Sequence, residues 1–267
     1  MELTLGRARR QDARRLAELM FHPDGPTLLE LARQALSSTE HGYDLLAPKF
    51  ERTPFRTPDT ILEPLASRIG GPRSIDAALD VCCGTGAAMR ALRPLCRTRV
   101  VGIDFSEGML AEARRRLEIT PGDARIELVR GDVRAMRFDA EFDVVTCVGA
   151  LGHILPADED AFVAGIARAL RPGGRFVFAT SERPPVTSRA WWISRTFNLV
   201  MHARNAIVRP PFIMFYLTFL WPDVRALLER HGLVVEAHRD VFAHPFERGV
   251  LVVATRSSDA RSATRVD

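Results

Sequence analysis

From Ser74 to Thr180 the chain alternates short apolar runs with longer stretches in which apolar residues recur every three or four positions. The short runs are five strand candidates: IDAALDV from Ile75, RVVGID from Arg99, RIELVRGD from Arg125, FDVVTCVG from Phe142 and GRFVFAT from Gly174. The stretches between them predict helices over 87–95, 107–117 and 159–170. Continuous apolar runs indicate strands buried on both faces, and helix-length connections imply parallel pairing. The pattern therefore predicts an open, mostly parallel α/β sheet.

Different patterns flank this alternation. Residues 1–71 show helical spacing interrupted by the prolines of TPFRTPD, and residues 1–20 alone predict a surface helix. Residues 181–221 hold all three tryptophans and are too apolar for a solvated loop, which indicates an insertion that covers part of the protein. A helix is expected over 222–231, with strands over 233–241 and 249–255. The polar tail, 257–267, is expected to be disordered.

Composition narrows the class of protein. The chain has 267 residues, 46% of them hydrophobic and 26% charged, which is enough to bury a sizeable core. Its formal charge of +4 comes almost wholly from arginine, because Lys49 is the only lysine. No compact basic run contains interleaved aromatic residues, so no nucleic-acid partner is expected.

Apolar runs and cysteines indicate where in the cell the protein is expected. The longest apolar run, from Phe212 to Trp221, is about half of the roughly 20 residues that cross a bilayer, so no transmembrane segment is expected. The N-terminus lacks the uninterrupted apolar run of a signal peptide. The four cysteines show no regular spacing, which is typical of a reducing compartment, and the cytoplasm is the expected location.

Candidate chemistry begins after the first predicted strand. Gly84 and Gly86 lie between that strand and a helix, where glycine lets a ligand approach the backbone. Asp104 ends the second predicted strand about 20 residues later, the spacing at which a carboxylate can accept hydrogen bonds from a ribose diol. The alternative is that Asp104 only caps the following helix. The combination predicts a nucleoside ligand at the carboxyl ends of the strands.

A dinucleotide would require a third small residue in the glycine motif, and Met89 stands there, which argues against a nicotinamide cofactor. The sequence instead resembles the class I S-adenosylmethionine (SAM) dependent methyltransferases. The resemblance rests on five motifs in order: LDVCCGTG, VVGIDFSEGML, RGDV, FDVVTCVGALGHI and LRPGG. It covers nearly the whole chain except the tail.

The resemblance implies a Rossmann-like, mostly parallel seven-stranded sheet, with an N-terminal helical cap (1–71), a SAM-binding core (72–256) and an insertion between strands five and six (181–221). It assigns the methionine moiety to Asp80 and the glycine loop, the ribose to Asp104, and the adenine edge to Asp132 and Val133. The family usually has glycine where Cys82 stands. The remaining candidates for cofactor contact are Phe105, Met109 and Gly149.

The expected reaction is direct displacement of the SAM methyl group by a nucleophile on a small acceptor, which needs alignment and exclusion of water. His153 is a candidate base, and His202 is a further one. A lone histidine beside apolar residues is, however, more often a packed or surface residue, so no catalytic residue is assigned.

Aromatic residues of the cap and the insertion are candidates for a lid over the acceptor or cofactor: Tyr43, Phe55, Trp191, Trp192 and Tyr216. They favour a hydrophobic or aromatic acceptor. The alternatives are that the insertion only packs against the sheet, or that Arg195, Arg204 and Arg209 contact a membrane surface, which is the less favoured interpretation.

Adjacent Cys82 and Cys83 cannot readily supply two corners of a tetrahedral metal site, and no base stands beside them, so no metal is expected. Two other classes of function stay open: a nicotinamide-dependent oxidoreductase, and a SAM-binding protein that acts through a partner without catalysis. The motifs LDVCCGTG and DFSEGML look like those of quinone-ring methyltransferases, but the segment after strand four does not match that subgroup, so the sequence assigns no acceptor.

Overall fold

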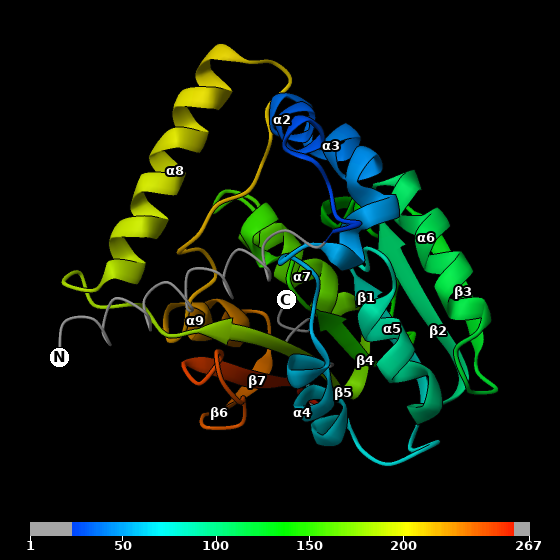
Figure 1. The fold of residues 1–267 in the computed structure, drawn as a ribbon. Helices are drawn as coiled ribbons and strands as arrows, with labels where there is room; N and C mark the ends of the chain where they lie inside the picture. Colours follow the sequence, from blue (N-terminus) through cyan, green and yellow to red (C-terminus); the bar gives the residue numbers. More distant parts are fainter. Residues whose placement is uncertain (1–22, 259–267) are drawn as a thin grey trace, which may run out of the picture.

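A computed structural model describes residues 23–258 (Figure 1). Seven strands form one sheet in the order β3-β2-β1-β4-β5-β7-β6. The pairs from β3 through β5 are parallel, whereas β7 runs antiparallel to β5 and β6. The strands are β1 (Ile75–Val81), β2 (Cys96–Asp104), β3 (Arg125–Arg130), β4 (Phe142–Cys147), β5 (Leu170–Ser181), β6 (Leu233–His238) and β7 (Gly249–Arg256). The predicted mostly parallel, seven-stranded open sheet is confirmed.

Helices connect the strands, and further helices form the cap and part of the insertion. They are α2 (Leu28–Leu36), α3 (Thr39–Leu46), α4 (Asp59–Ile69), α5 (Ala87–Leu92), α6 (Glu107–Glu118), α7 (Glu159–Ala169), α8 (Arg189–Ile207) and α9 (Asp223–Arg230), with a 3-10 helix η1 (Ala47–Arg52) after α3. Local sequence explains several starts. The hydroxyls of Thr27, Ser38, Ser106 and Ser188 accept hydrogen bonds from backbone N–H groups in the first turns of α2, α3, α6 and α8.

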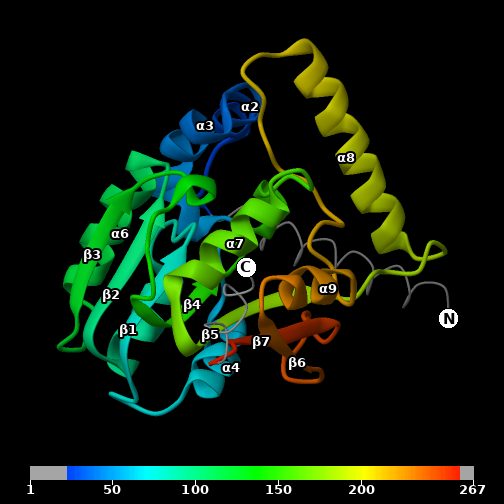
Figure 2. The same cartoon turned by 180° about the vertical axis from the view of Figure 1, so that it is seen from behind.

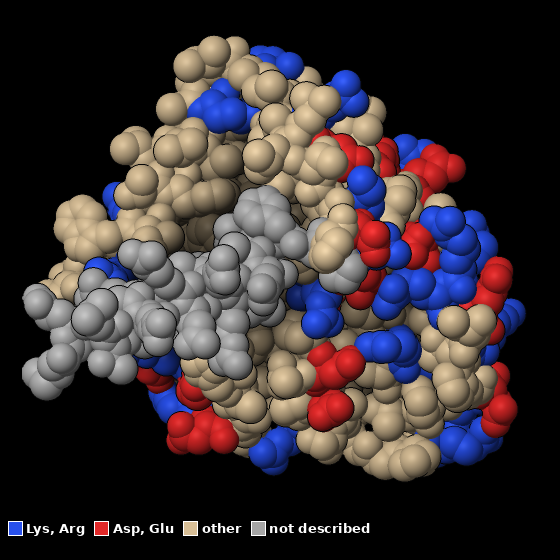
Figure 3. Space-filling model, in the orientation of Figure 1, with Lys and Arg blue, Asp and Glu red and all other residues tan. Residues whose placement is uncertain are grey.

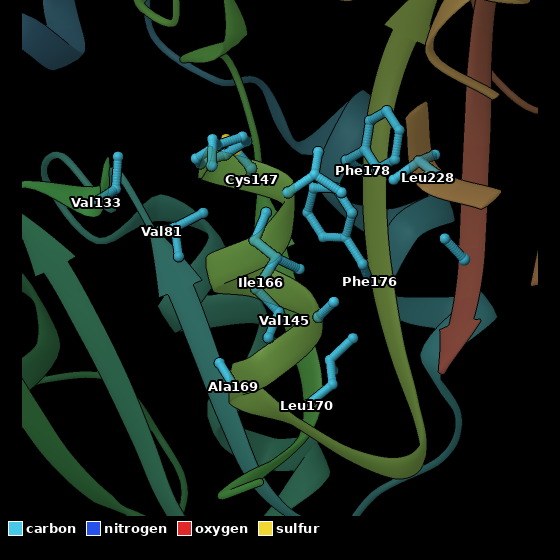
Figure 4. Close-up of a cluster of buried hydrophobic side chains, with 14 of the residues drawn as sticks. Val81, Val133, Val145, Cys147, Ile166, Ala169, Leu170, Phe176, Phe178 and Leu228 are labelled. Atoms are coloured by element: carbon cyan, nitrogen blue, oxygen red, sulfur yellow. The ribbon is translucent and has the colours of Figure 1, made fainter. Parts of the chain in front are cut away.

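Two apolar layers hold the helices on opposite faces of the sheet (Figure 2). On one face, α4, α5 and α6 bury residues such as Leu65, Met89 and Leu117 against β1, β2 and β4. On the other face, α7 and α9 bury Ile166 and Leu228 against β4, β5 and β7, as the close-up shows (Figure 4). The strands therefore read as continuous apolar runs because both of their faces are covered.

Several boundaries differ from the sequence prediction. The predicted helix over 87–95 ends at Leu92 and continues as a 3-10 turn, because Pro94 cannot donate a backbone hydrogen bond. Strand β5 begins at Leu170 and includes the LRPGG motif, and β6 ends at His238. The surface helix predicted for residues 1–20, and the tail from 259, lie outside the described residues.

The insertion forms a long helix that stands away from the sheet. Figures 1 and 2 show α8 projecting beside the body of the protein and returning through an extended segment that passes near α2. Met201 is the only buried residue of this helix. The predicted insertion therefore contains an element that leaves most of its own apolar side chains exposed.

Candidate functional site

A cavity lies where the loops after β1, β2 and β4 converge, at the carboxyl ends of parallel strands. Its empty space measures about 610 Å³, part of it open to solvent. Gly84 in the first loop has a φ of +52°, and a Cβ added there would meet no protein atom within 4 Å. A side chain would be strained in this left-handed backbone, so glycine is favoured, and it leaves room for a ligand to approach the loop.

Asp104 links the glycine loop to the end of β2. Its Oδ2 accepts a hydrogen bond from the Gly84 N–H at 2.8 Å, and its Oδ1 accepts one from the Ser106 N–H at 2.9 Å. Burial raises the pKa of this carboxyl group, although the backbone donors oppose the shift. Each oxygen keeps a second lone pair, so the side chain can still accept hydrogen bonds from a ligand in the cavity.

Asp80 lies beneath the loop and does not line the cavity. It is buried at the end of β1, where its Oδ1 accepts a hydrogen bond from the Thr146 hydroxyl at 2.7 Å. Burial raises its pKa to about 7, and the negative charge of Asp104 adds to this effect. A positively charged ligand above the loop would stabilise both carboxylates.

The structure gathers most of the predicted cofactor residues and leaves others aside. The cavity is lined by Cys82, Gly84, Asp104, Phe105, Met109 and Gly149. Gly86 has a φ of +82° and lies where a Cβ would come within 3.0 Å of Leu117, so it serves the close approach of the loop to α6. Asp132 and Val133 do not line the cavity. The Arg134 guanidinium binds the Asp132 carboxylate and lowers its pKa.

Two acidic residues of the cap, which sequence reasoning missed, hold it over the cavity. Asp44 accepts hydrogen bonds from the Ser106 hydroxyl at 2.6 Å and from the Gly108 N–H at 2.9 Å, at the start of α6. Glu51 accepts one from the Thr85 hydroxyl at 2.5 Å in the glycine loop. These contacts join positions about 35 to 65 residues apart in the chain, so no local sequence motif predicts them.

The cap also brings Tyr43 into contact with His153. The Tyr43 hydroxyl lies 2.8 Å from Nε2 of His153, and Nδ1 of the same ring lies 2.5 Å from the carbonyl oxygen of Ile213. Because that carbonyl can only accept, Nδ1 carries the proton and Nε2 accepts from Tyr43. Burial lowers the pKa of His153 and raises that of Tyr43. The pair is therefore neutral, and its unprotonated nitrogen accepts from Tyr43 between two residues that line the cavity.

A second hollow opens beside the first. Its empty space, partly solvent, measures about 1450 Å³, and it shares Phe55, Thr57 and His153 with the cavity. Residues of the segment after α8, including Phe215 and Tyr216, form one wall. We call this hollow the acceptor groove.

The aromatic lid candidates divide between these spaces and the surface. Tyr43 lines the cavity, Phe55 lines both spaces and Tyr216 lines the acceptor groove. Trp191 and Trp192 line neither one, and the side chain of Trp192 is 60% exposed. The second histidine candidate, His202, is an exposed residue of α8 whose ring stacks on Phe215.

The cysteines are not poised for nucleophilic chemistry. A hydrogen bond to Cys147, followed by burial, raises the pKa of Cys82 well above its usual range, and burial does the same for Cys83. Both thiols therefore stay protonated near neutral pH. Cys82 also has a φ of +56°, a left-handed conformation that favours glycine.

A glycine loop after β1, an acidic residue ending β2 and a seventh strand inserted antiparallel together define a class I SAM-dependent methyltransferase. The comparisons with known proteins agree. A family model described as "Methyltransferase domain" matches residues 78–174. A demethylmenaquinone methyltransferase of Clavibacter sepedonicus is 34% identical over 201 residues, which is 69% of this chain and 76% of that protein. The chain belongs to the class I SAM-dependent methyltransferase family.

Two further matches are more limited. A ubiquinone biosynthesis O-methyltransferase of Thiobacillus denitrificans is 40% identical over 105 residues, covering 39% of this chain and 44% of that protein. The magnesium protoporphyrin IX methyltransferase ChlM from Synechocystis PCC 6803, solved with S-adenosylhomocysteine, superimposes with a TM-score of 0.52 over 73% of this chain and 81% of that one. At 16% identity, this match shows the shared fold alone.

The protein is therefore an enzyme that uses SAM to methylate a small molecule. The cavity fits SAM, because an open glycine cradle meets an acidic residue with free lone pairs and an apolar wall that includes Phe105 and Met109. The nicotinamide-dependent alternative and the non-catalytic alternative find no support in these comparisons.

Within residues 23–258, every helix is too short or too polar to cross a membrane.

Proposed function

We propose that the acceptor is an apolar aromatic ring that bears a hydroxyl group, of the hydroquinone type, and that His153 removes the hydroxyl proton. The names of the relatives support the ring: one protein acts on demethylmenaquinone, and another is an O-methyltransferase of ubiquinone biosynthesis. The methyl group goes to the ring oxygen or to the carbon beside it, because loss of the hydroxyl proton makes both positions more nucleophilic.

The observation that carries this proposal is the position of His153, which lines both the cavity and the acceptor groove. A group at that junction can reach an acceptor while the acceptor faces the cofactor. The carbonyl of Ile213 fixes the tautomer, so Nε2 is the nitrogen that can take a proton. In the structure the Tyr43 hydroxyl is hydrogen-bonded to Nε2, and an acceptor hydroxyl would replace Tyr43 as the donor or share Nε2 with it.

SAM supplies the electrophilic methyl group. His153 takes the proton from the acceptor hydroxyl as the acceptor atom bonds to the methyl carbon and S-adenosylhomocysteine leaves, and the imidazolium then passes the proton to solvent. Where a ring carbon is methylated, that carbon afterwards loses its own proton and the oxygen regains one, which restores the aromatic ring. Tyr43 stays protonated and donates a hydrogen bond that can orient the ring or the acceptor oxygen. The contacts of Asp44 with the start of α6 and of Glu51 with the glycine loop hold the cap beside the cavity, which limits the access of water to the reacting groups.

The charges around the acceptor groove argue against an amine acceptor. Arg56 and Arg248 are the only charged side chains among its lining residues, and no carboxylate lines it. Most other lining side chains are apolar or aromatic, such as Phe215 and Leu220. An ammonium group would lack a counter-ion there, whereas a phenol or phenolate would not require one.

The test is transfer of radiolabelled methyl from SAM to a naphthoquinone ring supplied in its reduced and its oxidised form. Only the reduced form carries hydroxyl protons, so we expect incorporation with the hydroquinone and none with the quinone. Labelling of a simple amine, in place of the hydroquinone, would overturn the proposal.

A histidine variant tests the proton step separately. His153→Gln should lower kcat about 100-fold or more and leave affinity for S-adenosylhomocysteine within about threefold. His231→Gln is the matched control, because that ring lines neither hollow and pairs with Asp160 beside the end of α9, so the change should leave kcat unchanged. Equal activity of the two variants would exclude His153 as the base.

A further inference from the structure

The helix α8 has two faces with different surroundings. The inner face binds the segment that walls the acceptor groove: the Asn198 amide exchanges hydrogen bonds with the backbone of Tyr216, both at 2.8 Å, and Asn205 does the same with Phe212, both at 2.9 Å. These side chains recur at the spacing of one helical face. One side of α8 is thus fixed to the protein.

The outer face presents large apolar side chains to solvent. Their exposed fractions are 60% for Trp192, 67% for Ile193, 69% for Leu199, 58% for Val200 and 83% for Ile207. Spacings of seven and eight positions, about two helical turns, place them along one stripe of the helix. An exposed apolar stripe of this size is unusual unless it meets another surface.

The neighbouring helix α2 extends this surface. The Arg204 guanidinium donates hydrogen bonds to the carbonyl oxygens of Ala35 at 2.8 Å and of Ser37 at 2.6 Å, which ties α8 to the end of α2. Leu36 lies between those two residues and is 61% exposed. Arg204 is therefore a structural residue, and it does not belong to a free basic face as the sequence suggested.

The charge around the stripe has one sign. Between Glu182 and Asp223 the chain contains five arginines and no acidic residue. Within the described residues, Arg189 and Arg209 are exposed and make no ion pair, and the guanidinium of Arg195 lies over the ring of Trp191 at 5.6 Å. Figure 3 shows tan and blue atoms over the region of α8, with red atoms elsewhere.

We propose that the outer face of α8 docks the enzyme on an anionic lipid surface. The docking face consists of an apolar stripe and the arginines beside it: Arg189, Trp192, Ile193, Arg195, Leu199, Val200, Ile207 and Arg209. Apolar side chains enter the boundary between headgroups and acyl chains, while arginines bind the anionic headgroups. An acidic protein partner would match the charge, but the acceptor groove favours lipid.

The acceptor groove also favours docking on lipid. The same helix that carries the docking face holds Phe212 and Tyr216 through its inner side, and Tyr216 lines the acceptor groove. The helix that would dock therefore also holds one wall of the apolar hollow in place. The choice of lipid over an acidic protein rests on the proposed apolar acceptor, whereas partition onto vesicles is measured without any acceptor.

The experiment is flotation of the full-length protein with two kinds of vesicle, one of phosphatidylcholine alone and one with a quarter of phosphatidylglycerol. We expect at least about tenfold stronger partition onto the anionic vesicles, and loss of most of it in high salt. Equal partition onto both vesicles, or none onto either, would overturn the proposal.

Variants locate the surface. Trp192→Glu with Ile193→Glu should lower partition at least about tenfold, and Arg189→Gln with Arg195→Gln should remove the preference for anionic lipid. Ile119→Glu is the control, because Ile119 is 86% exposed in the turn after α6 and should bind as wild type does.

Each variant is first checked for stabilisation by S-adenosylhomocysteine, which shows that it is folded. Partition unaffected by the α8 changes would refute the assignment. Sedimentation of the free wild-type protein as a dimer that the same changes dissociate would assign the face to a second copy instead.

Discussion

Replacing Asp80 by Asn should make the enzyme more stable above neutral pH. The carboxyl group is 2% exposed and has a single side-chain donor, Thr146, and its pKa is raised to about 7 by burial and by the charge of Asp104. In the unfolded chain the pKa returns to about 3.9. An asparagine of nearly the same size keeps the oxygen that accepts from Thr146 and has no proton to lose.

The sign follows from the raised pKa. Native protein binds the Asp80 proton more tightly than unfolded protein does, so this stabilising contribution is complete below about pH 4 and is lost as pH rises through 7. A difference of about three pH units, at about 1.36 kcal/mol each, gives a loss of about 4 kcal/mol by pH 8. About 2.5 kcal/mol of that loss falls between pH 5 and pH 8.

The assay is urea denaturation of wild type and Asp80→Asn across pH 5 to 8. The variant should gain stability over wild type by about 2.5 kcal/mol across that range, as an order-of-magnitude figure. Asp123→Asn is the control, because this carboxylate is exposed and pairs with Arg73 at the surface. Parallel curves for wild type and Asp80→Asn would refute the interpretation of Asp80 as a buried, late-ionising acid.

Two further variants and a pH profile of the wild type test other parts of the structure. Cys82→Gly should change the free energy of unfolding by no more than about 1 kcal/mol, because relief of a left-handed backbone offsets lost packing and added chain entropy; a loss above about 2 kcal/mol in urea denaturation would contradict this. Trp191→Ala should leave kcat with a water-soluble hydroquinone within about twofold, since the ring lines neither hollow; a tenfold fall would restore it as a lid. Because burial lowers the pKa of His153, the acid-side half-maximum of kcat in wild type should lie below about pH 6.5; a half-maximum above pH 7 would contradict a neutral His153.

The sheet and the glycine loop follow from the sequence because their signals are local. A strand covered on both faces must be a continuous apolar run, and Gly84 must follow it where the backbone turns with a positive φ. The parallel pairing of these strands then follows from the helices between them, whereas their order in the sheet is seen only in the structure. Asp104 is the last residue of β2, as its spacing from the glycine loop predicted.

The closure of the site was not predictable in the same way. Asp44 reaches its partners across 62 and 64 residues, and Glu51 across 34 and 65 residues. A local sequence pattern therefore cannot contain both ends of these contacts. The pairing of Tyr43 with His153 spans 110 residues and depends on how the cap lies on the core. Apolar periodicity shows which face of an element is buried, but not which distant element buries it.

The insertion shows the opposite limit. Its aromatic residues indicated a cover, yet the structure divides them: Tyr216 faces the acceptor groove, whereas Trp192 faces solvent. Apolar composition alone cannot distinguish a side chain that lines a pocket from one that meets another surface. The run of arginines without acidic residues is the feature of the sequence that favours a second surface. Arg204, however, binds backbone carbonyl oxygens of the protein, so the position of each arginine in the structure decides whether it belongs to that surface.

The central claim is that the cavity above the glycine loop is the SAM site, held by Asp104. Calorimetric titration with S-adenosylhomocysteine tests it most directly, in wild type and in Asp104→Asn, with NADH as the competing ligand. We predict one site in wild type, no heat with NADH, and affinity at least about tenfold weaker in the variant, because an amide nitrogen cannot accept from a ribose hydroxyl or a backbone N–H. Binding of NADH, or undiminished binding of S-adenosylhomocysteine by Asp104→Asn, would contradict the account.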